Sequence, residues 1–228
     1  MRLRVVTYNV RSFRAGVALA VEAVGDATDV SPGVVMVQEY GPPHRLRAFA
    51  RALGMEVASS YRPFNRMRNA VLFRPPWRLR ASVVVALSKH PGQYRRGFVE
   101  ATLIHPEASL TAISTHLGLS ARERPVHADE ILERVPRTAP LILAGDLNDV
   151  RDSPAVRRLA EALTDCQAAV GDPSLPTFPA RAPSVRIDYV LVSPAIRPIS
   201  CEVAASEAAT RASDHRPIVA EVELLPRV

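Results

Sequence analysis

Residues 69–115 read NAVLFRPPWRLRASVVVALSKHPGQYRRGFVEATLIHPEASLTAIST, and this stretch decides the fold class. It contains four strand-like runs, NAVLF, ASVVVAL, FVEATLI and SLTAIST, with little room for a helix between them. Strands that follow one another this closely pair antiparallel, because a parallel crossover needs a dozen or more residues. The stretch therefore predicts mixed or antiparallel sheets rather than a doubly wound parallel sheet.

Outside this stretch, strands alternate with helices. Further strand-like runs are LRVVTYN, GVVMVQ, LILAG, RIDYVLVS and PIVAEVEL. Helices are predicted for PPHRLRAFARALG, for SARERPVHADEILERVP with Ser120 and Glu123 in capping-box spacing, and for DSPAVRRLAEALTD with Asp152 or Ser153 as N-cap. The Pro-rich GDPSLPTFPARAP is typical of a long surface loop. This order predicts an α/β (α+β) protein with two sheets packed face to face and helices outside.

The chain has 228 residues, 47% of them hydrophobic, which suits one domain spanning 1–228. The start MRLRVVTYNV enters a strand directly, without the apolar region of a signal peptide, and no apolar run is long enough to cross a bilayer. Cys166 and Cys201 are the only cysteines, so a disulfide framework is not indicated, although a single bridge between them stays open. We expect a cytoplasmic monomer.

The net charge is +6. Arginine carries nearly all the basic charge, because Lys89 is the only lysine. Six arginines crowd into residues 62–80, RPFNRMRNAVLFRPPWRLR, together with Phe64 and Trp77. Arginine forks bind phosphate, and aromatic rings stack on bases, so this segment is a candidate for tracking a nucleic-acid backbone. A compositional bias toward arginine and a solvated face are the plainer explanations.

Polar side chains that can ligate a metal or move a proton recur at the ends of the predicted strands. They are Asn9, Glu39, His116, Asp146 and Asn148 after strands, Asp188 near the start of one, and Asp214 and His215 just before the last. Each alone has a structural explanation: a turn, a cap, a hydrogen-bonded core histidine, or an Asp188 ion pair with Arg186. Together they form an oxygen-rich set suited to Mg²⁺ or Mn²⁺, which prefer carboxylate, amide and phosphate oxygens.

With these motifs the chain resembles the endonuclease/exonuclease/phosphatase superfamily of metal-dependent phosphoesterases, in the small bacterial group. The motifs that carry the resemblance run in family order over nearly the whole chain: TYNVR, VVMVQE, NAVLF, RRGFVEATL, STHLG, LILAGDLND, RIDYVLVS and SDHRPI. The resemblance implies a four-layer sandwich, with two mixed sheets flanked by helices and the site at one end.

The resemblance also implies roles for the residues at the strand ends. Asn9, Glu39 and Asp214 would hold Mg²⁺ or Mn²⁺. Asp146 would orient or deprotonate the attacking water and Asn148 would hold it or a phosphate oxygen, while His215, fixed by Asp188, and His116 would contact the phosphate. Asn69, Arg66 and Arg68 are the expected substrate contacts.

The expected partner is a phosphate-ester substrate hydrolysed by in-line attack of water. His116 in STHLG departs from the pattern of abasic-site endonucleases, which favours other branches. A DNA nuclease or DNA-end-processing phosphodiesterase is the main alternative, and a catalytically silent binding module with the same fold is a third.

Overall fold

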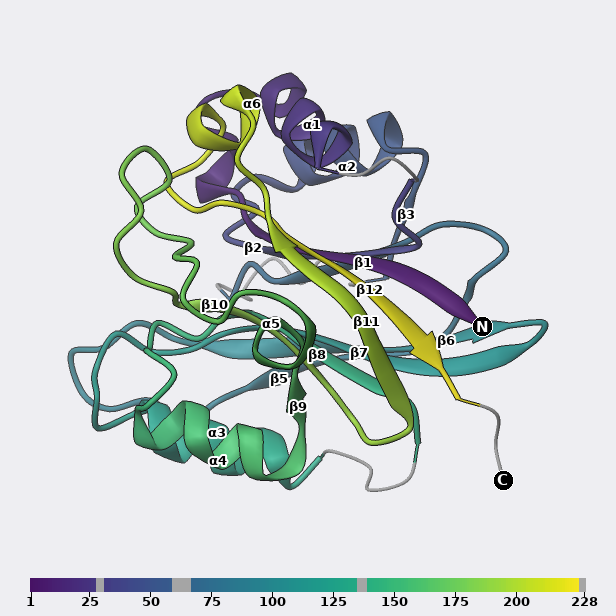
Figure 1. The fold of residues 1–228 in the computed structure, drawn as a ribbon. Coiled ribbons are helices and arrows are strands. Elements are labelled where there is room, and N and C mark those ends of the chain that lie inside the picture. The colour runs from purple at the N-terminus through teal and green to yellow at the C-terminus, as the bar shows by residue number, and fades with distance from the viewer. Residues whose placement is uncertain (28–30, 59–66, 135–138, 226–228) are drawn as a thin grey trace.

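The protein forms two six-stranded mixed β-sheets packed face to face, with helices on both outer faces (Figure 1). Its structure is a computed structural model that describes residues 1–27, 31–58, 67–134 and 139–225. The mixed sheets predicted from residues 69–115 and the four-layer arrangement implied by the family resemblance are both confirmed. Among the described residues, no helix is both long and apolar enough to cross a membrane.

The first sheet is built from both ends of the chain. Its strand order is β11 (Ile196–Val203), β12 (Ile218–Leu224), β1 (Arg2–Asn9), β2 (Val34–Gln38), β4 (Ala70–Phe73) and β3 (Glu56–Val57). β1 and β2 pair in parallel, with Asn9 opposite Gln38, and the other neighbours are antiparallel. Because β1 and β2 are parallel, Asn9 and the residues after Gln38 lie at one end of the sheet.

The second sheet contains the middle of the chain. Its order is β5 (Arg78–Ala86), β6 (Gly97–His105), β7 (Ala108–His116), β8 (Leu141–Asp146), β10 (Asp188–Val192) and β9 (Thr164–Asp165). β7 and β8 are parallel, and β8 pairs antiparallel with β10. His116, Asp146 and Asp188 therefore stand side by side, with Asp146 opposite both of the others.

Three apolar layers hold the sandwich together. Inward-facing side chains of both sheets, such as Met36, Val71, Val99 and Ala144, form the central core. α1 (Val17–Asp26), α2 (Pro43–Ala52) and α6 (Glu207–Arg211) pack on the first sheet, and α3 (Arg124–Leu132) and α4 (Pro154–Ala162) pack on the second (Figure 1). The short α5 (Cys166–Val170) follows β9, and η1 (Arg11–Phe13) is a single 3₁₀ turn after β1.

The helix ends match the predictions for α2 and for the start of α4, but both ends of α3 differ, since α3 ends at Leu132 rather than near Pro136. α4 starts as predicted, since the Ser153 hydroxyl accepts from the Val156 N–H at 3.3 Å and Pro154 is at the first helical position. α3 begins at Arg124 rather than Ser120, so the predicted capping box is wrong and Glu123 is buried instead. Cys166 and Cys201 are both buried and free.

Candidate active site

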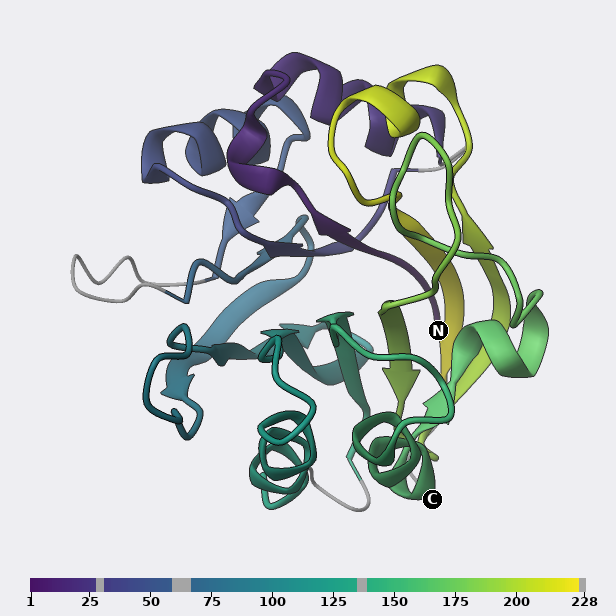
Figure 2. The same ribbon diagram turned by 90° about the vertical axis from the view of Figure 1, so that its left-hand side faces the viewer.

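The residues predicted to act in catalysis meet at one end of the sandwich, which faces the viewer in Figure 2. β1 and β2 of one sheet and β7 and β8 of the other end there, while β10 begins there and His215 precedes β12. A pocket of about 1020 Å³ opens at this end. Its lining includes five residues predicted from the sequence, namely Glu39, His116, Asp146, Asn148 and His215.

Asp146 is the centre of a buried hydrogen-bond network. Its Oδ2 accepts from Asn9 Nδ2 at 3.0 Å and lies 3.2 Å from His116 Nε2 and 3.6 Å from His215 Nε2. Its Oδ1 accepts from the Asn148 N–H at 2.9 Å. Asn9, His116, Asp146 and His215 are each at most 5% exposed. Residues separated by up to 206 positions thus meet at one carboxylate.

His215 is held by a buried carboxylate on the side of the ring that faces away from Asp146. Its Nδ1 lies 2.9 Å from Asp188 Oδ2, which also accepts from the Thr177 hydroxyl at 2.6 Å. The Phe178 ring packs on the imidazole with centroids 4.9 Å apart. Burial disfavours the charged ring, but the Asp188 charge and hydrogen bond, with help from Asp146 and Asp214, raise the pKa of His215 to about 10. His215 is therefore a cation at neutral pH.

His116 has the opposite charge state. Its Nδ1 lies 3.0 Å from Nη1 of Arg96, and because a guanidinium can only donate, Nδ1 must accept. Burial lowers the pKa of His116 to about 3, Asp146 opposes this, and Arg96 and His215 reinforce it. The neutral ring then carries its proton on Nε2, where it donates to Asp146.

Asn148 reaches the pocket by a turn. Two residues of one strand face the same way, and this spacing predicts that Asp146 and Asn148 share a face. β8 ends at Asp146, however, and Asn148 adopts a left-handed φ of 51°, with its Nδ2 donating to the Leu117 carbonyl at 3.0 Å. Leu147 is buried, and Asp149 pairs with Arg124 Nε at 2.7 Å outside the pocket, as expected of a turn residue.

The three residues predicted to bind a metal ion are only partly gathered. The Glu39 carboxylate lines the pocket and is 40% exposed, 3.8 Å from His116 Nδ1. Asn9 Oδ1 accepts from the Arg11 N–H at 3.1 Å, and Asp214 Oδ2 lies 3.1 Å from Arg11 Nε and lines a neighbouring pocket.

Another group, Asp146, Asp188 and His215, has ligand atoms within 4.8 Å of one another and could hold a metal ion. His215 and Asp188 already bind each other there, and an imidazolium offers no lone pair. The Glu39 carboxylate suits a hard cation better, because it lines the pocket, is 40% exposed and has only a long contact of 3.8 Å with His116 Nδ1 among the described residues.

The structure describes two of the three predicted substrate contacts, Asn69 and Arg68, and both are hydrogen-bonded to sequence neighbours of residues that line the pocket, Gly97 beside Arg96 and Tyr40 beside Glu39. Asn69 is buried and its Nδ2 donates to the Gly97 carbonyl at 2.7 Å, whereas Arg68 is exposed with a φ of 49°. Neither lines the pocket, and Arg66 lies outside the described residues.

In its described part, residues 67–80, the arginine-rich stretch does not form one surface. Trp77 is buried against His105, so it cannot stack on a base, and Arg74 donates to the carbonyls of Pro32 and Leu53. Phe64 lies outside the described residues.

Some residues of the site were not predicted. Arg96 lies in the quoted RRGFVEATL motif but had no assigned role, and Thr177 and Phe178 belong to the Pro-rich loop. The loop between β5 and β6 also lines the pocket, through Lys89, Gln93, Tyr94, Arg95 and Arg96. Only the position of Arg96 directly before β6 could have indicated that it enters the site.

Comparisons with known proteins agree with this fold. The chain is similar to an endonuclease/exonuclease/phosphatase from Bacteroides vulgatus (19% identity, 98% of this chain and 99% of that chain, TM-score 0.81). It is also similar to a mannosyl-6-phosphatase from Bacteroides thetaiotaomicron (18%, 97% and 99%, 0.81) and to D. rerio TDP2 complexed with a single-strand DNA product (19%, 97% and 99%, 0.74). No curated protein sequence matches the chain. At these identities the solved structures show a shared fold.

The family assignment comes from the sequence itself. A model of the endonuclease/exonuclease/phosphatase family matches residues 6–215, which include every residue of the Asp146 network. The chain therefore belongs to the endonuclease/exonuclease/phosphatase family.

Proposed function

We propose that the protein is a divalent-metal-dependent phosphoesterase that hydrolyses a phosphodiester or phosphomonoester by in-line attack of water. The observation that carries the proposal is the convergence of Asn9, His116, Asn148 and His215 on the Asp146 carboxylate beside an open pocket. A carboxylate held by fixed donors at the edge of a core is preorganised to orient a reacting molecule.

In this proposal Asp146 orients and deprotonates the attacking water. Its Oδ1 accepts from the Asn148 N–H at 2.9 Å, so the turn at Asn148 fixes the orientation of the carboxylate. The neutral His116 donates from Nε2 and so supports the Asp146 carboxylate in its charged form. Asn148 is the second contact for the water or for a phosphate oxygen.

His215 is the proposed cation for the scissile phosphate. The Asp188 carboxylate fixes its orientation and charge, and its Nε2 points to the Asp146 side, where the phosphate would lie during attack by the water. A buried imidazolium stabilises negative charge that develops on the phosphoryl oxygens more strongly than an exposed one, because water does not screen it.

The donor chemistry of the site fits Mg²⁺ or Mn²⁺. Glu39, with Asn9 and Asp214, would hold the ion, since each offers a carboxylate or amide oxygen. When bound, the ion would polarise a phosphate oxygen and neutralise charge.

A nucleic-acid substrate is the second candidate, and one observation favours it. Lys89, Arg95 and Arg96 line the pocket together with Tyr94, which is 71% exposed. Cationic side chains beside an exposed aromatic ring are typical of proteins that bind single strands. DNA nucleases and DNA-end-processing phosphodiesterases have such substrates.

An activity panel tests the proposal. The native protein is assayed with Mg²⁺ or Mn²⁺ and with EDTA on bis-p-nitrophenyl phosphate, p-nitrophenyl phosphate, supercoiled plasmid, an abasic-site duplex, 5′-tyrosyl DNA, phospholipids and inositol phosphates. We expect EDTA-sensitive turnover of at least one substrate. Ligand binding without hydrolysis and without a metal requirement would instead identify a silent binding module.

Asp146→Asn is the decisive variant, because it keeps the side-chain shape and removes the base. We expect kcat to fall by about 10²–10⁴-fold, the usual contribution of general acid–base catalysis. Asp152→Asn is the matched control, since its side chain is 85% exposed on the turn before α4. Near-native turnover of Asp146→Asn would refute the role assigned to this carboxylate.

A further inference from the structure

We infer that a second pocket, next to the active site, binds another phosphate group of the same substrate. This inference rests on the proposed function and adds the substrate class, namely molecules that carry at least two phosphates. The second pocket, which we call the arginine pocket, measures about 260 Å³, and its charged lining residues are Arg11, Arg14, Arg181, Arg211 and Asp214.

The arginine pocket adjoins the active-site pocket along two stretches of chain. Phe178 and His215 line the active-site pocket, and their sequence neighbours Pro179 and Asp214 line the arginine pocket. The Ala180 N–H donates to the Asp214 carbonyl at 2.7 Å, so the two stretches are joined. A substrate whose reacting phosphate contacts His215 therefore has its neighbouring groups within reach of the arginines.

The arginine pocket has a large excess of positive charge. Four guanidiniums face one carboxylate, and Asp214 is already paired with Arg11 Nε at 3.1 Å. Among the residues that the structure describes, Arg211 pairs only with Glu207, an i,i+4 contact whose carboxylate is 80% exposed and which contributes little. Arg14 and Arg181 are exposed, and neither side chain has a hydrogen bond or ion pair within the described parts of the chain.

Such a cluster suits phosphate for two reasons. Gathering like charges costs free energy that a bound anion recovers. In addition, the planar guanidinium matches the oxygens of a phosphate and can donate two parallel hydrogen bonds to it. Two unpaired guanidiniums beside a concave surface are therefore the expected features of a phosphate subsite.

The turn that presents Arg11 and Arg14 is held firmly in place. Arg11, Ser12 and Phe13 have left-handed φ values of 43°, 57° and 52°. Non-glycine residues rarely adopt this conformation unless their surroundings enforce it. Here the Ser12 N–H donates to the Glu39 carbonyl at 2.7 Å, and Phe13 is buried against the Phe49 ring.

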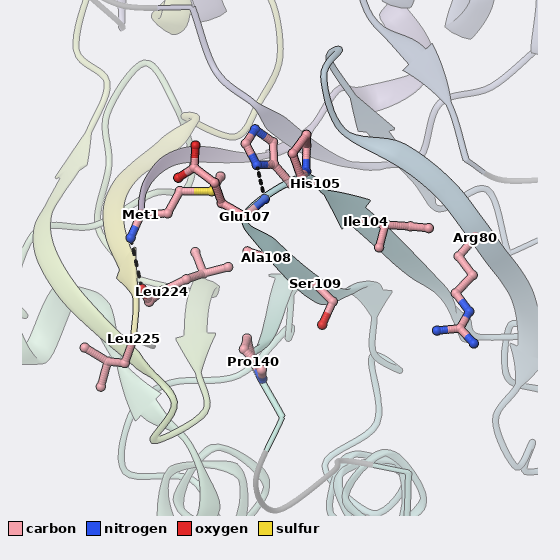
Figure 3. Close-up of a pocket in the computed structure, with 11 residues that line it drawn as sticks. Met1, Arg80, Ile104, His105, Glu107, Ala108, Ser109, Pro140, Leu224 and Leu225 are labelled. Atoms are coloured by element: carbon pink, nitrogen blue, oxygen red, sulfur yellow. Dashed lines mark hydrogen bonds between the residues drawn. The ribbon is translucent and has the colours of Figure 1, made fainter. Parts of the chain in front are cut away.

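The arginines of residues 74–80 provide a matched control. Arg80 lines a pocket of about 630 Å³ that Met1 and His105 also line (Figure 3), and exposed Arg78 pairs in the sheet with Ile104 of the same pocket. Met1 precedes β1, so this pocket lies at the end of the sandwich opposite the active site (Figure 1). Removing Arg78 and Arg80 changes the net charge as much as removing Arg14 and Arg181 does.

The first experiment measures binding without catalysis. A fluorescein-labelled oligothymidylate is titrated in EDTA, and anisotropy gives Kd at several salt concentrations. Each phosphate contact contributes about 0.7 to the slope of log Kd against log salt on a single strand, so Arg14→Ala/Arg181→Ala should lower the slope by about 1.4. Arg78→Ala/Arg80→Ala should keep the native slope.

The second experiment distinguishes a nucleic-acid strand from a small bisphosphate. The substrates are the p-nitrophenyl phosphate esters of thymidine, at the 5′ or the 3′ position, each with and without a phosphate on the other hydroxyl. If a small bisphosphate is the ligand, the extra phosphate raises kcat/KM of the native protein in Mg²⁺, and Arg14→Ala/Arg181→Ala loses that advantage. A slope change on oligothymidylate without this preference identifies a strand.

The inference is overturned if Arg14→Ala/Arg181→Ala changes neither the salt slope nor the preference for the second phosphate. It is also overturned if Arg78→Ala/Arg80→Ala causes the slope loss instead, because the strand would then lie at the other end of the sandwich. Failure to hydrolyse any ester in Mg²⁺ would refute the proposed function alone, since the binding measurement in EDTA does not depend on turnover.

Discussion

A buried ion pair between Arg186 and Asp165 supports the strand that carries Asp188, and we predict that breaking it strongly destabilises the fold. Arg186 Nη2 lies 2.6 Å from Asp165 Oδ1, and the two side chains are 6% and 8% exposed. The guanidinium also lies over the Tyr189 ring, 4.3 Å from its centroid. Among the described residues, Nε and Nη1 of Arg186 have no hydrogen-bond partner, so Asp165 supplies the charge that compensates Arg186.

The substitution Asp165→Asn isolates this charge. Asp165 Oδ1 also caps α5 by accepting from the Gln167 N–H at 3.1 Å, and asparagine can keep that cap. Removing one partner of a buried pair costs about 3–5 kcal/mol, because a buried charge is left uncompensated. At about 2–4 °C per kcal/mol for a chain of this size, Tm should fall by about 6–20 °C.

Urea unfolding followed by circular dichroism in EDTA measures the free energy of unfolding. Glu223→Gln is the control, because its pair with Arg197 is exposed to solvent and should contribute little to stability. The double variant Arg186→Met/Asp165→Asn should be more stable than Asp165→Asn, since it removes the orphaned charge. If Asp165→Asn stays within about 0.5 kcal/mol of the native protein, as ordinary surface substitutions do, the reasoning is wrong.

Two further predictions concern Gly145, which precedes Asp146 in β8, and Asp188, which binds His215. Gly145 has a φ of 152°, and an added Cβ would lie 1.9 Å from the Thr115 carbonyl oxygen, so Gly145→Ala should cost about 1–3 kcal/mol or more in urea unfolding. Gly25→Ala, in open space on α1, should instead stabilise by about 0.5–1 kcal/mol, and equal signs for the two would contradict this account. Asp188→Asn should lower kcat by about 10²-fold or more, because His215 loses the charge that keeps it cationic. Thr177→Val, which removes one hydrogen bond to Asp188, should lower kcat by only about tenfold; a larger loss than that of Asp188→Asn would contradict the assigned order.

The positions of the strand ends could be predicted well from the sequence, because one simple pattern marks each of them. An apolar run that stops at a polar residue must end at the edge of the core, and parallel pairing brings such edges together. Asn9, His116 and Asp146 meet for this reason. Strand β11 and helices α1 and α6 were not predicted, because their apolar residues are interrupted by polar or small ones.

The arginine-rich stretch shows why sequence clustering fails as a guide to surfaces. Successive residues of a strand point to opposite faces, and turns redirect the chain between strands. Trp77 therefore enters the central core, while Arg80 lies at the end remote from the active site. The arginine pocket, by contrast, collects Arg11, Arg181 and Arg211 from three distant segments, which no local pattern could indicate.

Arg186 illustrates how one open alternative was decided by topology. Its position two residues before Asp188 allowed an ion pair between them, which would have made Asp188 a structural residue. β9 pairs with β10 and brings Asp165 to Arg186, so Asp188 is left to bind His215. Asp165 lies in a strand of only two residues and has no sequence signal of its own. Because Asp165 pairs with Arg186, the Asp188 carboxylate remains available to bind His215.

The charge states of His116 and His215 also depend on residues that other segments bring next to each ring. Both direct Nε2 to the same oxygen of Asp146, at 3.2 and 3.6 Å, so that oxygen cannot explain why one ring is neutral and the other charged. The difference lies behind the rings, where His116 Nδ1 meets the guanidinium of Arg96 and His215 Nδ1 meets the carboxylate of Asp188. Asp146 is thereby flanked by one neutral and one cationic donor, which lets the site support a carboxylate base and an anionic phosphate at once.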